Sequence, residues 1–322
     1  GIQWVNDMHD NYYKNPSIFE NWEYGFHYVP NVEFETSAYY YDPKIRSFTE
    51  EYRYKFLTNN LGYVHDKLIV QNKKSILIIG DSFTEGRGGY PWVNDLDLNK
   101  KNNIQLISAG IQGTGIQSWE KTVQKLKNRF KVEKIVIIFI FDDFFRDIWS
   151  FDKKQMECFS NIALCNYKNL HLPKNHTINE VDAISNLSRD TFFIFNKMKS
   201  LISSFKTNFY IEDHTNKLSN LRLDSNLKSL ETILSQFSSE NVLLINLPQY
   251  NELSLGLDKA TSKLNKKVTK IAKDSNIEYI RISKMCKLEK KDYLYRDKHF
   301  NIAGYKKLSK CVNDLINSKW KY

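Results

Sequence analysis

The stretch SILIIGDSFTEG, which runs from Ser75 to Gly86, decides the fold. Its first residues form an unbroken apolar run that ends at Gly80. A run without polar alternation is typical of a strand that is buried on both faces of a sheet. Both faces then need covering helices, which predicts an α/β domain.

Apolar runs of the same kind recur along the chain, and helical patterns separate them. The runs are residues 104–108, 135–141, 241–247 and 277–282, and the helical patterns include residues 116–130 and 227–237. Strands that alternate with helices indicate βαβ units, because parallel strands need a crossover connection. We predict an α/β fold, doubly wound around a mainly parallel sheet of five strands.

Two parts of the chain depart from this alternation. Residues 1–70 are rich in Tyr, Trp and Phe, and the weak alternation of residues 31–41 indicates loops with a small antiparallel element. Residues 150–225 interrupt the strands with irregular polar sequence and one helical stretch, residues 192–205. We predict an N-terminal cap segment over residues 1–70, which wraps a domain of residues 71–322. The insertion in that domain could shape a pocket or a lid.

The composition excludes several classes of protein. Of the 322 residues, 41% are apolar and 14% are aromatic, which is enough for a large core and excludes a wholly disordered chain. The counts of 12 Gly and 6 Pro exclude collagen-like sequence. The longest apolar run, residues 135–141, is too short to cross a bilayer. These features predict a soluble globular protein.

The formal charge of +10, from 47 basic and 37 acidic residues, is spread along the chain. Its densest stretch, residues 259–273, has apolar residues at helical spacing, which leaves the lysines on the outer face of a helix. No nucleic-acid-binding motif accompanies this charge, so a solvated helix face explains it better than an anionic partner. We expect no nucleic-acid partner.

The cysteines and histidines show no metal-binding pattern. None of Cys158, Cys165, Cys286 and Cys311 lies in a CxxC pair, and the histidines lack the spacing of metal ligands. Two disulfides could form, but four cysteines in a chain of this length fix no redox compartment. We predict no metal and no cofactor.

Four loops that follow predicted strands carry closely spaced polar residues. They are GDSFTEG at residues 80–86, AGIQGTG at 109–115, FDDF at 141–144 and YRDKHF at 295–300. In doubly wound sheets, ligands bind beyond the carboxyl ends of the strands. These loops are therefore the candidates for a site.

Together the loops resemble the motifs of the SGNH hydrolases, also called the GDSL family. GDSFTEG matches the block that carries the nucleophile, here Ser82, and SAGIQG matches the glycine block and points to Gly113. The last loop supplies Asp297 and His299 in DxH form. A GDS tripeptide alone is weak evidence, but its place after a buried strand and the C-terminal DxH make the match specific. The match spans residues 75–315 and implies a flavodoxin-like SGNH fold.

The resemblance also implies a catalytic triad. A serine hydroxyl is a poor nucleophile unless an adjacent base takes its proton. His299 would be that base, and Asp297 would orient the imidazole and stabilise its charged form. Taken singly, Ser82 could cap a helix and Gly113 could serve a turn. Their joint occurrence at strand ends favours the triad, with the backbone N–H groups of Ser82 and Gly113 in an oxyanion hole.

One position departs from the family pattern. The third block normally supplies an Asn whose amide stabilises the oxyanion, but Asp142 stands there in this chain. A carboxylate donates no hydrogen bond and would repel the developing negative charge. Three explanations stay open: Asp142 is protonated in a buried site, it turns towards Arg146, or the alignment is shifted by one residue.

Arg87 follows the nucleophile block directly. It could contact an acidic or hydroxyl-rich substrate at the mouth of the site. A surface arginine that pairs with Glu85 or with solvent explains it equally well. Arg87 is therefore a candidate for substrate binding.

By resemblance, the expected function is that of a serine esterase that works through an acyl-enzyme and removes an O-acyl group, such as acetyl, from a carbohydrate. The same triad could instead transfer the acyl group to a glycan hydroxyl, as an O-acyltransferase does. Asp142 keeps a third alternative open, a non-catalytic carbohydrate-binding module on the same scaffold. The expected partner is an acylated carbohydrate or another small ester.

The start of the chain bears on its location. Because the sequence begins at Gly1 with no apolar leader, we expect a processed or trimmed form, with any signal peptide or membrane anchor upstream. Together with the resemblance to glycan esterases, this favours an extracytoplasmic protein. The residues themselves would equally suit the cytoplasm.

Overall fold

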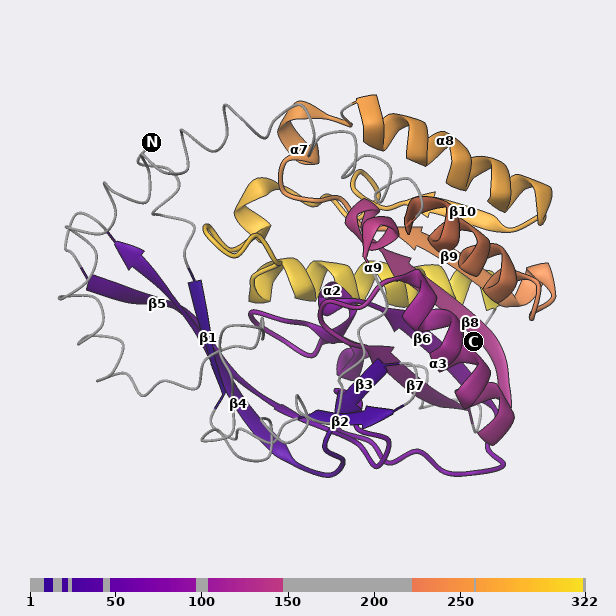
Figure 1. The fold of residues 1–322 in the computed structure, drawn as a ribbon, viewed down its shortest axis with the longest axis horizontal. Helices are drawn as coiled ribbons and strands as arrows, with labels where there is room; N and C mark the ends of the chain where they lie inside the picture. Colours follow the sequence, from indigo (N-terminus) through magenta and orange to yellow (C-terminus); the bar gives the residue numbers. More distant parts are fainter. Residues whose placement is uncertain are drawn as a thin grey trace, which may run out of the picture.

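A parallel β-sheet forms the centre of the protein in the computed structural model (Figure 1). The structure describes residues 9–13, 19–22, 25–42, 47–96, 104–146, 222–257 and 259–320. The sheet has the order β10–β9–β8–β6–β7, and all its pairs are parallel. Its strands are β6 (Ser75–Gly80), β7 (Gln105–Gly110), β8 (Val132–Phe139), β9 (Val242–Asn246) and β10 (Glu278–Arg281). The predicted doubly wound sheet of five strands is confirmed, with the flavodoxin-like strand order.

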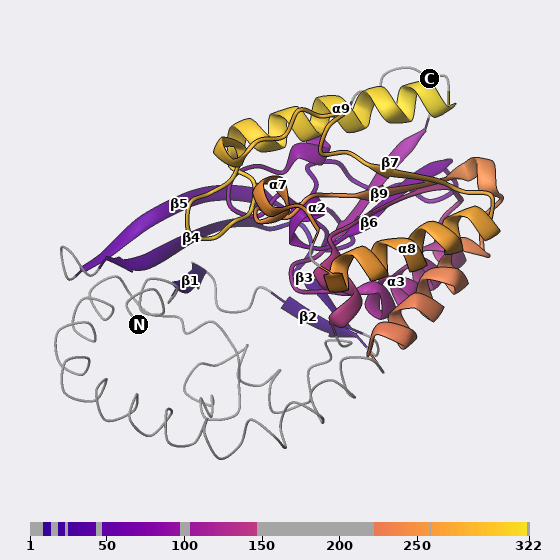
Figure 2. The ribbon, with the colours of Figure 1, turned by 90° about the horizontal axis from the view of Figure 1, so that it is seen from above.

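The central strands β6, β8 and β9 are apolar along most of their length because helices cover both faces of the sheet, whereas the edge strand β10 begins and ends with a charged residue. In β6, Ile76 and Ile78 pack in one core cluster with residues of α9 (Ile302–Trp320). Leu77 and Ile79 pack in a second cluster on the other face. That cluster includes residues of α3 (Ile116–Arg129), α8 (Lys259–Asp274) and a helix over residues 222–234. Figure 2 shows the sheet between α9 and the α3–α8 layer.

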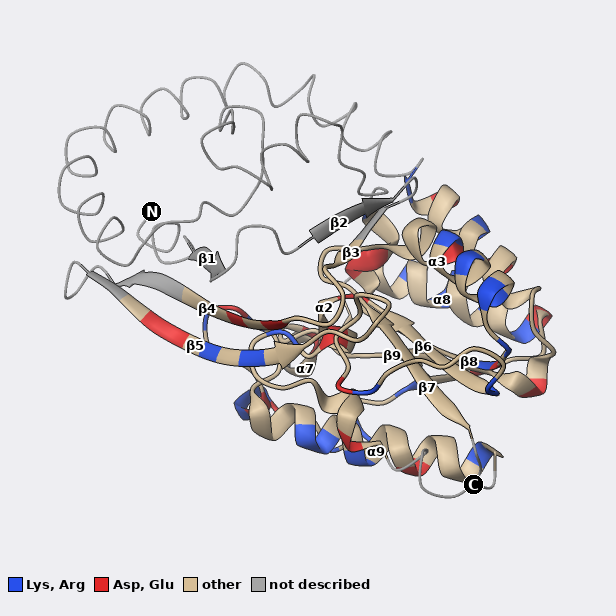
Figure 3. Cartoon of the chain, turned by 90° about the horizontal axis from the view of Figure 1, so that it is seen from below, with Lys and Arg blue, Asp and Glu red and all other residues tan. Residues whose placement is uncertain are grey.

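The amphipathic pattern at residues 259–273 corresponds to α8. Its Leu264 and Val268 are buried against the sheet, whereas its lysines from Lys263 to Lys273 are exposed. Lys and Arg residues outnumber Asp and Glu residues on α3, α8 and α9, which lie on both sides of the sheet (Figure 3). The remaining helical segments are short: α2 (Ser82–Glu85), α7 (Glu252–Leu255), and the 3₁₀ turns η1 (Trp92–Asp95), η3 (Phe141–Phe145), η5 (Ser239–Asn241) and η6 (Lys290–Asp292).

The N-terminal part contains more regular structure than the sequence indicated. Two long strands, β4 (Glu33–Asp42) and β5 (Ser47–Leu57), form an antiparallel hairpin, here called the N-terminal ribbon. β1 (His9–Tyr13) pairs with β4, and β2 (Phe19–Trp22) pairs with β3 (Gly25–Tyr28). Figures 1 and 2 show the ribbon extending away from the parallel sheet.

Aromatic side chains fasten the base of the ribbon to the main core. Tyr28, Phe34 and Phe56 are buried and belong to the cluster that lies between the sheet and α3. The Tyr28 and Phe56 rings meet edge to face, with centroids 5.3 Å apart, a favourable aromatic geometry. The ribbon therefore shares a hydrophobic core with the parallel domain.

One disulfide closes the C-terminal part of the chain. Cys286, after β10, is bonded to Cys311 in α9, 25 residues later. The other two cysteines and the helical stretch predicted at residues 192–205 lie outside the described residues. No helix among the described residues is both long and apolar enough to span a membrane.

Candidate active site

Ser82 lies where the strand order reverses. The chain passes from β6 to β7 on one side and then to β8 on the other, so the carboxyl end of β6 opens at the switch point of the sheet. α2 begins there at Ser82, and Asp81 is its N-cap, with a carboxylate oxygen accepting the Phe83 N–H at 2.9 Å. The serine is thus the first residue of the helix and not its cap.

Two glycines allow α2 to sit directly on the end of the sheet. Gly80 and Gly110 are register partners at the ends of β6 and β7. A Cβ at Gly110 would lie 2.6 Å from the backbone N of Glu85, which is closer than Cβ atoms approach other heavy atoms in proteins. The loop after β7 is therefore held beside Ser82.

The structure brings Ser82, His299 and Asp297 together. The Ser82 Oγ and the His299 Nε2 are 2.7 Å apart, and the other ring nitrogen, Nδ1, contacts Asp297 Oδ1. With Nδ1–H donated to the carboxylate, Nε2 is free to accept the serine proton. The Asp297 side chain is 3% exposed and that of His299 is 16% exposed, so the imidazole is the more exposed member of this Asp297–His299 dyad.

The backbone of Lys298 explains how a carboxylate and an imidazole can meet across one intervening residue. Lys298 adopts φ +67°, in the left-handed region, which turns the chain back on itself. Asp297 Oδ1 then accepts the His299 N–H at 3.3 Å as well as contacting the ring. The Phe83 ring packs on the imidazole, with centroids 4.6 Å apart, and limits its rotation.

Gly113 lies in the loop after β7 and has φ +73°, a conformation that favours glycine. Glu85 of α2 holds this loop, because its carboxylate accepts the Gln112 N–H at 2.8 Å. The same carboxylate accepts a hydrogen bond from the Tyr28 hydroxyl at 2.8 Å, which connects the N-terminal part of the chain to α2.

Glu85 is a buried carboxylate without a close ion pair. Burial raises its pKa to about 7, while the hydrogen bonds from Tyr28 and Gln112 and the charge of Arg87 oppose this rise. Nothing in the sequence singles out this glutamate, except its place in the GDSFTEG block.

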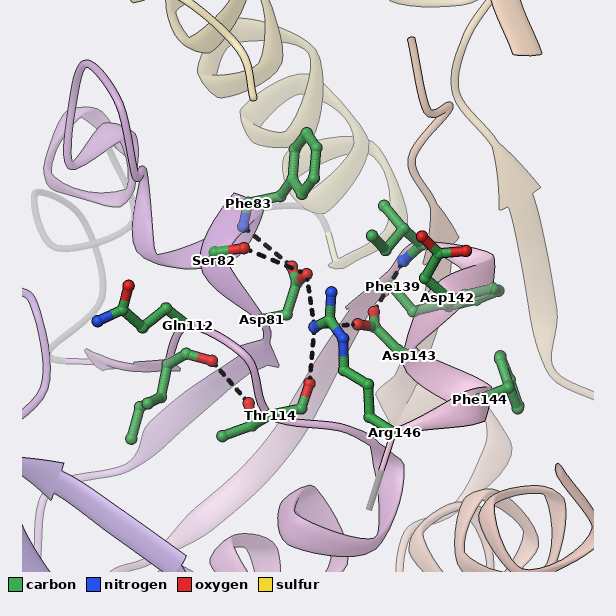
Figure 4. A network of polar contacts seen from close by, with 12 residues as sticks. Asp81, Ser82, Phe83, Gln112, Thr114, Phe139, Asp142, Asp143, Phe144 and Arg146 are labelled. Carbon is green, nitrogen blue, oxygen red and sulfur yellow. Dashed lines mark hydrogen bonds and ion pairs between the residues drawn. The ribbon is translucent and has the colours of Figure 1, made fainter. Parts of the chain in front are cut away.

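Asp142 does not stand at the oxyanion position that the family pattern predicts. Its side chain is exposed and accepts a hydrogen bond from Gln249 at 2.7 Å. Figure 4 shows it pointing away from Ser82. The 3₁₀ turn η3 places the next residue, Asp143, inward instead.

Asp81, Asp143 and Arg146 form a cluster, here called the Arg146 cluster (Figure 4). Arg146 Nη1 lies 3.0 Å from Asp81 Oδ2 and 2.6 Å from Asp143 Oδ1, and it donates to the Thr114 carbonyl at 3.0 Å. Burial and the charge of Asp81 raise the pKa of Asp143 well above its usual value, and Arg146 opposes the rise. The explanation that Asp142 turns towards Arg146 is therefore wrong. It is Asp143 that lies beside Arg146.

Arg87 forms a second group of polar and charged side chains with Tyr52 and Asp297, here called the Arg87 cluster. Its Nε donates to the Tyr52 hydroxyl at 3.3 Å, and its Nη1 donates to Gln112 Oε1 at 2.9 Å. Arg87 Nη2 lies 3.9 Å from Asp297 Oδ2. The guanidinium thus contacts the proposed dyad itself, a role that its sequence position did not indicate.

Among the described residues, no group of three or more His, Cys, Asp or Glu side chains could hold a metal ion. The site consists of hydroxyl, imidazole, carboxylate and guanidinium groups.

No protein-family model and no curated protein matches the sequence. Solved structures with similar folds include a lipase/acylhydrolase from Enterococcus faecalis, with 16% identity over 76% of this chain and 96% of that one and a TM-score of 0.42. A lipolytic G-D-S-L family protein from Veillonella parvula has 14% identity over 76% and 98%, with a TM-score of 0.38. An acetylxylan esterase from Geobacillus stearothermophilus has 13% identity over 78% and 96%, also with a TM-score of 0.38. Each match covers about three quarters of this chain and nearly the whole of the other chain, at 16% identity or less.

Proposed function

We propose that this protein is a serine esterase of SGNH type that works through an acyl-enzyme. The observation that carries the proposal is the 2.7 Å contact between Ser82 Oγ and His299 Nε2, with Asp297 on the other ring nitrogen. This arrangement is recognised by its geometry and the roles of its groups. Ser82 is the nucleophile, His299 the general base and acid, and Asp297 the group that orients the imidazole.

The reaction proceeds in two halves. Ser82 Oγ attacks the ester carbonyl while His299 Nε2 takes its proton, and a tetrahedral oxyanion forms. The imidazolium then gives this proton to the departing alcohol, which leaves Ser82 acylated. In the second half, His299 takes a proton from water, the hydroxide oxygen attacks the acyl carbon, and the acid leaves as Ser82 recovers its proton.

The oxyanion would bind to the backbone N–H groups of Ser82 and Gly113. The N–H groups of a first helical turn have no partner within the helix, and the Asp81 cap takes that of Phe83. Asp142 faces away and supplies no donor. Arg146 supports the two backbone donors, because it contacts Asp81, which precedes Ser82, and Thr114, which follows Gly113.

For the substrate, we propose an acyl group, such as acetyl, on a carbohydrate hydroxyl. This part of the proposal rests on the resemblance of the sequence motifs to those of the family. Transfer of the acyl group to a second sugar would use the same triad and would differ only in the acceptor that attacks the acyl-enzyme.

The test compares wild type with Ser82→Ala in hydrolysis of a short-chain chromogenic acetate and in labelling by a fluorophosphonate. Loss of a triad nucleophile lowers turnover by on the order of 10⁴-fold or more, so we expect only background from the variant. Ser238→Ala is a matched control, because this exposed serine precedes η5 at the amino end of β9. Equal labelling of wild type and Ser82→Ala would exclude Ser82 as the nucleophile. Labelling without hydrolysis, but with acyl transfer to an added sugar, would favour the transferase.

A further inference from the structure

The N-terminal ribbon has a β-bulge where it meets the loop of Asp297. Ala38 of β4 pairs with Tyr52, and the next residue of β4 pairs with Glu50. Glu51 is therefore an extra residue in β5, without a register partner on β4. Consecutive side chains of a regular strand point to opposite faces, but a bulge re-aims them. Here Glu51 and Tyr52 both reach the loop.

Glu51 holds the backbone of this loop. Its two carboxylate oxygens accept the N–H groups of Arg296, at 2.6 Å, and of Asp297, at 2.9 Å. Hydrogen bonds to an ionised acceptor are stronger than those between neutral groups. The side chain thereby fixes the position of the residue that supplies the proposed triad carboxylate.

Tyr52 holds the carboxylate itself. Its hydroxyl donates to Asp297 Oδ2 at 3.3 Å, while Oδ1 contacts the ring of His299. The hydroxyl in turn accepts the Arg87 Nε–H at 3.3 Å. The Tyr52 ring is buried and packs with Leu294 of the same loop. The two oxygens of Asp297 are thus divided between the ribbon and the imidazole.

From these contacts we propose that Glu51 and Tyr52 are positioning residues for the Asp297–His299 dyad. The inference rests on the proposed function for its effect on the reaction. In this arrangement the N-terminal ribbon is part of the catalytic apparatus, because two of its side chains set where the carboxylate lies and which oxygen faces the ring.

The expected effect is on the chemical step. Misplacement of a reacting group by about 1 Å can cost on the order of 10²-fold in rate, so Glu51→Gln and Tyr52→Phe should lower kcat by about 10- to 100-fold. KM should change little, since neither side chain is assigned to substrate. Loss of the Tyr52 hydroxyl removes a hydrogen bond from Asp297 Oδ2, so the contact between Asp297 Oδ1 and the His299 ring should change.

The closing experiment uses the full chain and two independent readouts. The first is the rate of Ser82 labelling by a fluorophosphonate, with kcat and KM for a chromogenic acetate across pH. The second is the NMR signal of the His299 Nδ1 proton, which reports the contact with Asp297 whether or not the protein is active. Glu50→Gln is the matched control, because this exposed glutamate of β5 pairs with Arg53 on the surface.

Slower labelling and a shifted Nδ1 signal in Glu51→Gln and Tyr52→Phe, with neither change in Glu50→Gln, would support the inference. If wild type takes up label, labelling at the same rate in both variants would overturn the inference, whatever the NMR signal does. If wild type takes up no label while the signal shifts in both variants, the dyad is positioned by the ribbon as inferred, and it is the esterase function that fails.

Discussion

Two arginine–carboxylate clusters reach the proposed nucleophile, and they are built differently. In the Arg146 cluster, one guanidinium nitrogen lies within 3.0 Å of two carboxylates that are at most 1% exposed. In the Arg87 cluster, the guanidinium stays 3.9 Å from Asp297, and one oxygen of that carboxylate contacts His299. Both clusters touch Ser82, the first through Asp81 at 3.4 Å and the second through His299 at 2.7 Å.

The difference separates a structural carboxylate from one that can act in catalysis. A carboxylate in a close ion pair is largely neutralised, so it adds little to the stability of an imidazolium. Arg87 lies 3.9 Å from Asp297, farther than Arg146 lies from its two carboxylates, so it neutralises the charge of Asp297 less. The same residue types therefore stabilise the fold in one cluster and, on the proposed function, orient the imidazole in the other.

The largest effect is expected when each arginine is replaced by Met. Arg146→Met leaves two buried carboxylates without their cation, and removing one partner of a buried ion pair costs about 3–5 kcal/mol in the free energy of unfolding. Arg87→Met should cost about 1–2 kcal/mol, because it removes hydrogen bonds to Tyr52 and Gln112 and a longer ion pair with Asp297. Its larger effect should be on kcat. Urea unfolding and acetate hydrolysis measure the two quantities.

A compensated variant controls for general damage at the Arg146 cluster. Asp143→Asn removes one of the two carboxylates that face the arginine, so adding it to Arg146→Met should restore part of the lost stability. Equal stability losses in the two arginine variants would contradict the comparison.

Glu85 sharpens the comparison, because it is a buried carboxylate for which the described part of the chain shows no arginine ion pair, although the charge of Arg87 acts on its pKa. Its pKa, raised to about 7 by burial, means that the folded state holds the proton more tightly than the unfolded state does. The contribution of this group to stability is full below about pH 4.5 and is lost as the pH rises through about 7. Relative to Glu85→Gln, wild type should lose about 3 kcal/mol of unfolding free energy between pH 4.5 and pH 8.

Urea unfolding of wild type and Glu85→Gln at pH 4.5, 6 and 8 checks this expectation. The amide keeps the shape of the side chain and can still accept the Gln112 N–H. Parallel curves for the two proteins across this range would show that the Glu85 carboxylate does not titrate there.

The smallest effect is expected from Asp142→Asn. The side chain is exposed and bonded to Gln249, so the change should alter the unfolding free energy by no more than about 0.5 kcal/mol. Acetate hydrolysis should stay within about twofold of wild type, because the change touches no donor of the oxyanion hole. Asp143→Asn is the variant to compare with it, because Asp143 is buried beside Arg146 whereas Asp142 is exposed. A clearly faster Asp142→Asn enzyme would mean that this side chain turns inward when substrate binds.

The parallel sheet could be predicted from sequence because burial on both faces leaves an unbroken apolar run. Ser82, Asp297 and His299 could be singled out because their motifs follow predicted strands in order. The hairpin partner β5 escaped prediction, since its sequence, SFTEEYRYKFL, mixes charged and aromatic residues without clean alternation.

The finer parts of the site depend on geometry that the sequence does not encode locally. Asp142 and Asp143 are adjacent and chemically identical, and the η3 turn alone decides which of them is buried. Glu51 reaches the loop because a bulge adds one residue to β5. Neither a turn register nor a bulge leaves a pattern that one sequence can reveal.

The contacts around His299 also set an order of events during synthesis. Ser82 meets its base 217 residues later, and Tyr52 meets Asp297 across 245 residues. A nascent chain can therefore complete all five parallel strands, the last of which ends at Arg281, while Ser82 still lacks its proposed base. Contacts of such long range also slow folding, because the ends of a long loop must meet before the contact stabilises anything. On the proposed function, the Ser82 hydroxyl therefore gains its base only when almost the whole chain has emerged and closed on itself.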